Sequence, residues 1–402
     1  MSVLGVHPVD QFEGVTDATD FSLVLGGPLY QLFRRAHLSG DALELLHRRM
    51  IGIVLIAWLP LLVLSFVAGP GAPIGIPFLR DVDTQVKFLV ALPLLVSAEL
   101  MVHLRTRSVA RNFLTRHIIP AADLPRLHDI VRSAKRVRNS VVLEVGLLIC
   151  VFTVGHWLWR SQTALTTNSW YAVGDSAQWT LTPAGYWYAF VSIPVFQFLL
   201  IRWYLRLLIW GWFLWRVSRL NLQLVCTHPD RAAGLAFLGK SAYAFAPILF
   251  AQGTLLAGLI ANKVMFEGAD LLSFKLEAVT LVGFFVVFVF GPQIVFTPKL
   301  ALAKQTALSE YGLLATDYVR GFEEKWIRSP GAGRDDLLGS ADVQSLADLA
   351  GSFDVIREMR FVPFGWRDVT RLVITTVLPL LPLALFKISF EDLIFKLLRI
   401  VV

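Results

Sequence analysis

The chain has 402 residues, of which 55% are hydrophobic and only 17% are charged, and its mean hydropathy is +0.61. A soluble domain usually has about 45–50% apolar and about 25% charged residues, so this composition excludes an ordinary soluble enzyme or binding domain. The formal net charge is +7, but no module of interleaved basic and aromatic residues accompanies it, and a nucleic-acid partner is not predicted.

Seven long apolar runs predict seven membrane-spanning helices, because about 20 residues at 1.5 Å each cross a hydrocarbon core about 30 Å thick. The runs are 50–68, 86–104, 140–159, 186–208, 242–262, 277–296 and 371–387. All except 140–159 contain proline, which removes a backbone donor and frees a carbonyl, so kinked helices are expected. The last run is short and has Pro379 and Pro382. A re-entrant hairpin, leaving six spans, is the alternative there.

The fold predicted from this pattern is an all-α bundle of about seven transmembrane helices with interfacial amphipathic helices and a cytosolic helical hairpin. Spans alternate with polar segments along the chain. The order is a tail with amphipathic helices (1–49), spans one and two (50–104), a basic helical loop (105–139), spans three and four (140–210), a second loop (211–241), spans five and six (242–297), the helical hairpin (298–370), and span seven with an amphipathic tail (371–402).

Basic residues are unevenly distributed between these segments. With alternate loops on opposite sides, 29 of the 37 Lys and Arg residues fall on the side of 1–49, 105–139, 202–240 and 298–371. The positive-inside rule places that side in the cytoplasm. The N-terminus is therefore predicted to be cytoplasmic and, with seven spans, the C-terminus outside. Membrane lipids, including those with anionic headgroups, are the partners that the basic excess predicts.

The candidate functional site is a layer of polar residues on the cytoplasmic side of the predicted bundle. Glu99 and, one turn later, His103 lie on one face of span two. Similar depth is reached by Glu144, Arg202 and Gln293 on spans three, four and six. Ionisable groups at this depth are costly, so they are expected to face the bundle and pair. The pattern predicts an ion- or proton-coupled site in which Arg202 is the counter-ion of the two glutamates.

Two other interpretations of this layer stay open. The charged residues can form a structural clamp between helix ends, with His103 and Arg206 reaching out to headgroups. Glu99, His103 and Glu144 can also be metal ligands, although a metal site needs at least three ligands and supporting groups around them. No cofactor is predicted.

Mid-membrane amides form a second candidate set. Gln197 on span four and Gln252 on span five can bond between helices, or Gln252 can line a pathway for a solute. Small residues form a stripe on the same span as Gln252, at Ala246, Gly253, Ala257 and Ala261. Such a stripe favours close helix packing.

Short motifs indicate no chemistry. The tripeptide His228-Pro-Asp230 is predicted to be a turn, because proline fixes φ for turn formation. The sequence has neither a Gly-x-Ser-x-Gly nor a His-Glu-x-x-His pattern. An enzymatic function is therefore not favoured.

Three segments carry a resemblance to a known family. Met359-Arg-Phe-Val-Pro-Phe-Gly365, Val377-Leu-Pro-Leu-Leu-Pro382 and the His-Pro-Asp-x-x-x-Gly loop at 228–234 resemble the C-terminal region of an uncharacterised family of bacterial multipass membrane proteins. The resemblance implies a location in the bacterial inner membrane. It implies no activity, cofactor or site residue.

The function that these observations favour is movement of a small solute or ion through the bundle. The kinked spans and the intramembrane glutamates and arginine support it. The alternative is a non-catalytic membrane scaffold or signalling component that binds a protein partner at the cytosolic hairpin 298–370. The large share of the chain in helices outside the membrane and the lack of any sharp motif support that alternative.

Overall fold

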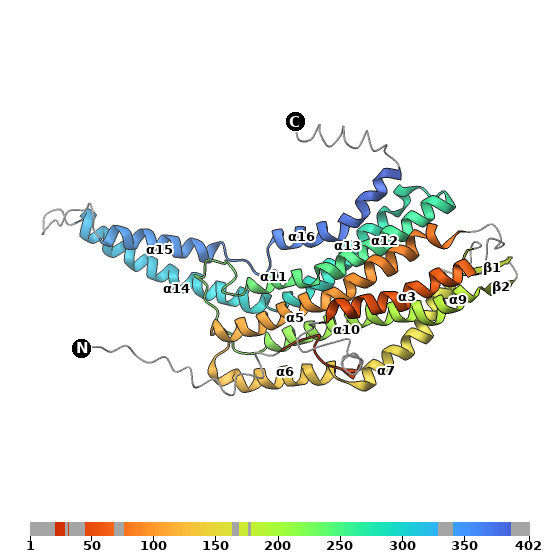
Figure 1. Cartoon of the computed structure of the whole chain (residues 1–402). Coiled ribbons are helices and arrows are strands. Elements are labelled where there is room, and N and C mark those ends of the chain that lie inside the picture. The colour runs from red at the N-terminus through yellow and green to blue at the C-terminus, as the bar shows by residue number, and fades with distance from the viewer. Residues whose placement is uncertain are drawn as a thin grey trace.

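A computed structural model describes residues 21–28, 31, 45–67, 76–162, 169–175, 178–328 and 341–386. Within these residues the fold is all-α apart from one two-stranded hairpin (Figure 1). In this described part, seven helices are long and apolar enough to cross a membrane. They are Leu46–Val67, Val82–Thr115, Val141–Trp159, Pro183–Ser218, Phe237–Glu267, Leu271–Ile294 and Trp366–Phe386. The predicted fold class is confirmed.

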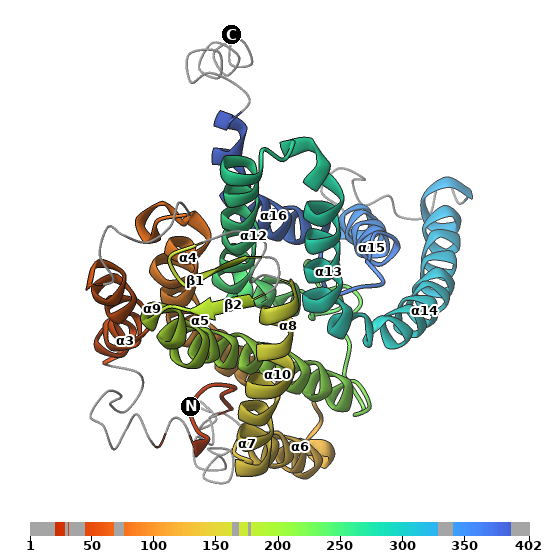
Figure 2. The same cartoon turned by 90° about the vertical axis from the view of Figure 1, so that its right-hand side faces the viewer.

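Three of the seven spans form the interior of the bundle. In the second, fourth and fifth spans 50–61% of the residues in the most apolar stretch are buried, against 17% in each of the other four. Viewed from one end, α5 (Leu92–Thr115) and α10 (Ile193–Val217) lie between α3 (Leu46–Val67) on one side and α12 (Ala246–Glu267) on another (Figure 2). The outer spans expose large apolar side chains, as expected where lipid is the solvent.

Prolines in the second and fourth spans follow wide helical turns. A π-helical turn, Lys87–Ala91, joins α4 (Val82–Val86) to α5, and a second, Tyr188–Ser192, joins α9 (Pro183–Trp187) to α10. Pro93 and Pro194 lie just after these turns. The wider turn removes the hydrogen bond that proline cannot donate. These turns show how two of the spans accommodate proline, whereas the predicted kinks stay a prediction.

Pro60 lies inside α3 and leaves a carbonyl without its helical donor. That carbonyl belongs to Ile56 and accepts a hydrogen bond from the Trp187 indole at 3.2 Å. The adjacent carbonyl of Ala57 accepts from the Ser192 hydroxyl at 2.6 Å. Backbone groups in lipid require such partners, so these contacts fix α3 against the fourth span.

The third span combines α7 (Val141–Cys150), a π-helical turn (Val151–Gly155) and α8 (His156–Gln162). At the end of the bundle reached by α8, β1 (Ala172–Asp175) pairs antiparallel with β2 (Gln178–Leu181). We call this end, with the two strands, the hairpin end. Elsewhere along the chain, short 3₁₀ segments connect helices at Phe78–Arg80, Ala121–Asp123 and Leu271–Phe274.

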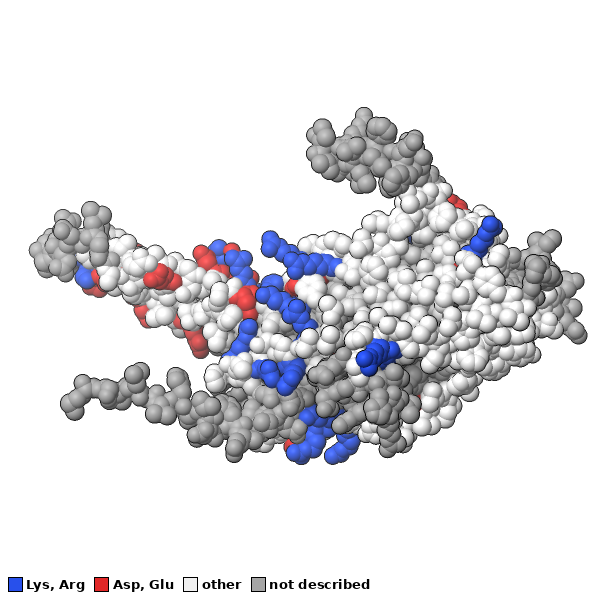
Figure 3. Space-filling model, viewed as in Figure 1, with Lys and Arg blue, Asp and Glu red and all other residues white. Residues whose placement is uncertain are grey.

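The opposite end carries most of the positive charge and is called here the basic end. It is formed by α6 (Leu124–Arg138), residues 218–236 and α11 (Phe237–Ser241), which leads through a 3₁₀ turn (Ala242–Phe245) into α12. Lys and Arg side chains gather there on the face shown in Figure 3. The loop predicted at 105–139 contains two helices, of which the first is the continuation of α5 to Thr115.

A long arm extends from the basic end. The sixth span is α13 (Lys275–Ile294), and α14 (Thr297–Glu323) follows it, ending in a π-helical turn (Glu324–Arg328). α15 (Ala341–Arg357) packs back along α14, and the pair projects beyond the bundle (Figures 1 and 2). The predicted hairpin of two helices is therefore present.

The last span does not turn back within its described residues. α16 (Trp366–Val377) continues directly into a 3₁₀ helix, Leu378–Phe386, which contains Pro379 and Pro382. The re-entrant alternative finds no support in this part of the chain. The predicted amphipathic tail beyond 387 and nearly all of the amphipathic helices predicted in 1–44 lie outside the described residues.

The loop before α11 is organised by one carboxylate. Asp230 accepts hydrogen bonds from the backbone N–H groups of Ala232, Gly234 and Ala236 at 2.9–3.1 Å. The Arg360 side chain donates to the Asp230 carbonyl at 3.0 Å. The tripeptide at 228–230 is thus a turn, as predicted, and it ties the chain after α15 to the bundle.

Replacing Asp230 with asparagine is expected to cost about 1–3 kcal/mol of unfolding free energy at pH 7, because the N–H groups lose a charged acceptor. Although burial opposes ionisation, these N–H groups lower the pKa of Asp230 below its usual value. Because the pKa of this carboxyl is lower in the folded protein than in the unfolded chain, where it is about 3.9, ionisation of Asp230 stabilises the fold at pH values above about 3.9. This stabilisation is lost as the pH falls through the folded-state pKa.

The measurement is thermal unfolding of wild type, Asp230→Asn and Asp348→Asn at pH 7 and at pH 3. Asp348 is exposed on α15 and serves as the control. The gap between wild type and Asp230→Asn should shrink at low pH. A gap of constant size would show that the carboxylate charge does not stabilise the loop.

Candidate functional site

The predicted polar layer is assembled around Glu99 on α5. Its carboxylate forms ion pairs with Arg49 of α3 and with Arg206 of α10, the latter at 3.0 Å between Oε1 and Nη1. The three side chains are at most 7% exposed. Charges this deep in a membrane bundle are stable only when they are paired, so Glu99 joins three helices at one point.

A third ion pair lies one helical turn away on α10. Arg202 Nη2 is 3.0 Å from Oε1 of Glu144 on α7, and both side chains are at most 10% exposed. The three ion pairs together contain three guanidinium groups and two carboxylates. The cluster formed by Arg49, Glu99, Glu144, Arg202 and Arg206, called here the ion-pair cluster, therefore carries one excess positive charge.

One predicted pairing and one predicted position are corrected by this geometry. Arg202 is the partner of Glu144, as predicted, but the ion pairs of Glu99 are with Arg49 and Arg206. Arg206 does not reach headgroups, because it is buried and stacks on the Trp203 ring at 4.6 Å. Arg49, which sequence analysis assigns to the cytosolic segment before span one, is 2% exposed because α3 begins at Leu46 and turns it toward α5.

His103 faces the interior rather than the headgroups. Its Nδ1 atom is 2.8 Å from the Ser22 hydroxyl. Ser22 belongs to a segment, residues 21–28, that lies between α5, α6, α7 and α10, and we call it the N-terminal plug. Phe21 of this plug is buried and stacks on Phe213 with ring centroids 4.5 Å apart.

Two glycines bring the plug against the ion-pair cluster. Gly26 and Gly27 have φ values of 135° and 94°, a region that residues with a Cβ rarely adopt. A Cβ on Gly27 would lie 2.9 Å from the Glu144 carboxylate and 3.4 Å from the Arg202 guanidinium. The plug therefore covers the cluster from the basic end.

Positive charge accumulates around the plug. Arg138, at the end of α6, donates to the Ser22 carbonyl. Burial and, to a smaller extent, the charge of Arg206 lower the pKa of Arg138 to about 10. Neighbouring guanidinium groups thus repel one another here, and an anionic group is favoured electrostatically.

The predicted amides lie outside the ion-pair cluster. Gln293 on α13 is fully buried, and neither of its amide atoms has a hydrogen-bond partner among the described residues. Gln252 on α12 is also buried, beside Tyr204, and its Nε2 atom lacks a partner there as well. Gln197 donates to the Gly155 carbonyl at 3.1 Å, which satisfies a backbone group of the π-helical turn.

A second buried polar cluster lies at the hairpin end and was not identified from the sequence. Lys87 Nζ is 2.7 Å from the Asp83 carboxylate and 3.4 Å from the Tyr188 hydroxyl. Asp81 accepts hydrogen bonds from Asn262 at 2.7 Å and from the Trp170 indole at 2.8 Å. The available signal was the i, i+4 spacing of Asp83 and Lys87 at the start of span two.

Both clusters are built on the same two spans. Twelve residues, about 18 Å of helix, separate Lys87 from Glu99, and Tyr188 and Arg202 are similarly spaced along the fourth span. Buried apolar side chains occupy the interval, among them Phe88, Leu95, Phe196, Leu199 and Trp203. Trp203 also donates its indole N–H to the Leu95 carbonyl at 2.9 Å. An apolar layer therefore separates the two polar clusters.

A metal site does not form from the predicted ligands. Within the described ranges, no group of three or more His, Cys, Asp and Glu side chains is placed to hold a metal ion. Glu99 and Glu144 are instead engaged by arginines. The arrangement can hold charge or exchange it between ion pairs.

Comparison with protein-family models, with curated proteins and with solved structures finds no match to this chain. The chain is a multipass helical membrane protein with buried charge pairs. Its functional interpretation rests on the geometry of these pairs and of the plug.

Proposed function

We propose that the protein moves a small ion or polar solute and that the ion-pair cluster is where this cargo is recognised. The supporting observation is that five ionisable side chains from four helices meet at one depth of the bundle, beneath a plug formed by the same chain. Such an assembly is costly in a membrane and often marks an ion or solute pathway.

The charge balance favours an anion as the cargo. Three guanidinium groups face two carboxylates, so an anion entering the cluster would neutralise the excess charge. Glu99 contacts two arginines, and one of them can turn to an anion while the other keeps the glutamate paired. Guanidinium groups suit this role because they bind oxyanions through paired N–H donors.

The plug and the apolar layer would act as two barriers. The plug covers the ion-pair cluster at the basic end, and the apolar layer separates it from the polar cluster at the hairpin end. Movement of cargo would require the plug to leave and the layer to open in turn. We therefore expect loosening of the plug to increase flux.

The test is ion flux into proteoliposomes that contain the full chain, with chloride, nitrate, phosphate and protons as probes. Phe21→Ala combined with Leu23→Ala removes two buried side chains of the plug and should raise the flux of at least one probe above wild type. Glu99→Gln, in folded protein, should lower that flux several-fold. Glu277→Gln is the matched control, because Glu277 is exposed on the sixth span.

Flux that equals that of empty liposomes for all probes, in wild type and in the plug variant, would contradict the proposal. It would favour the second candidate, a scaffold or signalling component. That candidate is supported by the arm, which leaves Leu302, Leu313, Leu314 and Ile327 exposed. A photo-cross-linking residue at position 313 should then capture one defined protein partner, whereas the same residue at exposed position 344 should not.

We further propose a location in the bacterial inner membrane with the basic end in the cytoplasm, in agreement with the family resemblance and the charge distribution. Cys226 lies at the basic end, and burial together with the Glu310 carboxylate raises its pKa. An impermeant thiol reagent applied at alkaline pH should therefore label Cys226 only after cells are opened. Labelling in intact cells would reverse the orientation.

A further inference from the structure

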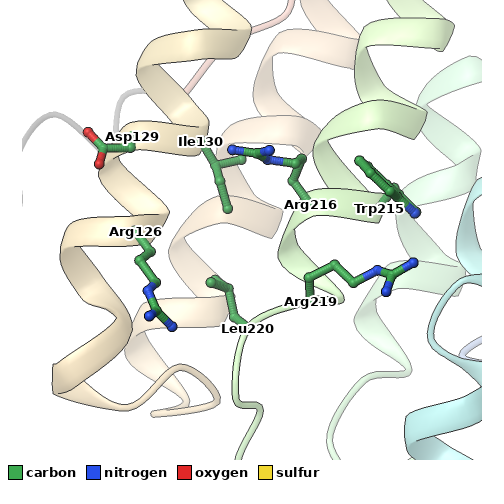
Figure 4. Close-up of a pocket in the computed structure, with 7 residues that line it drawn as sticks. All are labelled: Arg126, Asp129, Ile130, Trp215, Arg216, Arg219 and Leu220. Atoms are coloured by element: carbon green, nitrogen blue, oxygen red, sulfur yellow. The ribbon is translucent and has the colours of Figure 1, made fainter.

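A groove at the basic end has a composition that suits an acidic headgroup. It lies between α6 and the end of α10 and has a volume of about 570 Å³. Arg216 reaches from α10 toward Ile130 on α6, and Arg126 and Arg219 flank the groove on the two sides (Figure 4). The buried side chains of Ile130 and Leu220 and the exposed Trp215 form its apolar part.

The arginines of the α10 end are not neutralised by the protein. Arg216 stacks over the Trp212 ring at 5.5 Å and Arg219 over the Trp215 ring at 5.4 Å. In the described part of the chain neither of them forms an ion pair with a carboxylate. Stacking holds each side chain in place while its N–H donors stay available.

Acidic residues near the groove are already engaged. Arg126 is paired with Asp123 at 3.0 Å, yet its side chain is 71% exposed and keeps free donors. Asp129 is 3.3 Å from Arg132 and points away from Arg216 and Arg219 in Figure 4. The groove itself therefore presents an excess of positive charge.

Lys299 adds to this excess from the start of α14. It donates to the Leu220 carbonyl. Burial lowers its pKa, and although the Asp123 carboxylate opposes this shift, the charge of Arg219 lowers the pKa further. A phosphate group in the groove would relieve this repulsion between neighbouring cations.

The groove lies at the edge of the membrane. The fourth span ends at Ser218, between Arg216 and Arg219. α6 packs one apolar face, including Leu127 and Val131, against the bundle and leaves Arg132 and Arg136 exposed. Exposed Trp215 matches the preference of tryptophan for the same depth.

We propose that this groove binds the phosphate group of an anionic phospholipid. The guanidinium groups of Arg126 and Arg216 would hold the phosphate, and Arg219, whose side chain points away from Arg126 in Figure 4, would add positive charge at the rim. The glycerol region and upper acyl chains would lie on Ile130, Leu220 and Trp215. A phospholipid fits better than a soluble phosphate because the basic rim is continuous with apolar side chains at membrane depth.

The experiment measures phospholipid binding to the full-length protein in detergent by native mass spectrometry. Phosphatidylglycerol and phosphatidylcholine are titrated against wild type, the Arg216→Gln, Arg219→Gln double variant and an Arg111→Gln, Arg136→Gln control, which removes the same charge from exposed positions on α5 and α6 that do not line the groove. At about fivefold per arginine near the surface, the double variant should bind phosphatidylglycerol about 30-fold more weakly than wild type. The control should bind nearly as wild type does.

Three results would overturn the proposal. Equal binding of the two lipids by wild type, or an equal loss of phosphatidylglycerol binding in both variants, would show that only general surface charge acts. Full displacement of phosphatidylglycerol by millimolar inorganic phosphate would show that the groove binds a free anion. Thermal unfolding of each variant without added lipid separates a lost site from a lost fold.

Discussion

Glu99→Ala is expected to lower the free energy of unfolding by about 3–5 kcal/mol, the usual cost of removing one partner from a buried ion pair. The substitution leaves Arg49 and Arg206 without their carboxylate in the interior of the bundle. Both guanidinium groups are at most 5% exposed, so water cannot replace the lost partner. The effect should therefore exceed that of any single surface charge.

Thermal or mild detergent-induced unfolding of purified Glu99→Ala measures this cost. Glu277→Ala provides the control, because that glutamate is exposed in the first turn of α13 and should change stability by less than about 0.5 kcal/mol. Glu99→Gln should fall between the two, since it keeps an acceptor for one arginine. If Glu99→Ala lowers the free energy of unfolding by less than about 1 kcal/mol, the burial of Arg49 and Arg206 does not depend on pairing with Glu99.

Gly253→Val is expected to separate α12 from α16 and to destabilise the last span. A Cβ at Gly253 would lie 2.0 Å from the carbonyl oxygen of Thr376, a distance that no packing adjustment of side chains can relieve, since the clash is with backbone. Overpacking of a core usually lowers the free energy of unfolding by about 1–3 kcal/mol. The cost of a backbone clash should lie at or above the upper end of that range. This contact also confirms the packing role predicted for the small-residue stripe.

Gly283→Val is the matched control for this substitution. Gly283 lies on α13 in the sixth span, and nothing is within 4 Å of a Cβ placed there. Hydrogen exchange should show faster opening of 366–386 in Gly253→Val and no change in Gly283→Val. Equal exchange in both variants would show that close contact with α12 does not hold α16.

Membrane spans were predictable because the requirement that defines them is local. A helix must present enough consecutive apolar residues to match the hydrocarbon core, and this can be counted along the sequence. Depth along a helix follows from the same count, which is why Glu99, Glu144 and Arg202 were correctly placed near one level. The turn at Asp230 was equally local.

Pairing between helices was not predictable in the same way. The partners of Glu99 depend on how α3, α5 and α10 rotate about their axes, and apolarity on several faces leaves that rotation open. Lys87 lies at the start of the apolar run 86–104, but its burial against Asp83 was not predicted. The plug escaped notice because it is an apolar stretch too short to span a membrane.

The position of the plug also constrains the order in which the molecule can be completed during synthesis. Phe21 is made early, but two of its aromatic partners, Trp210 and Phe213, belong to the fourth span. At about 5–20 residues per second, roughly 10–40 s pass before those partners exist. Throughout that interval the plug lacks the α10 side of its binding site, which also carries Arg202 and Arg206, so docking of the plug is a late event in assembly.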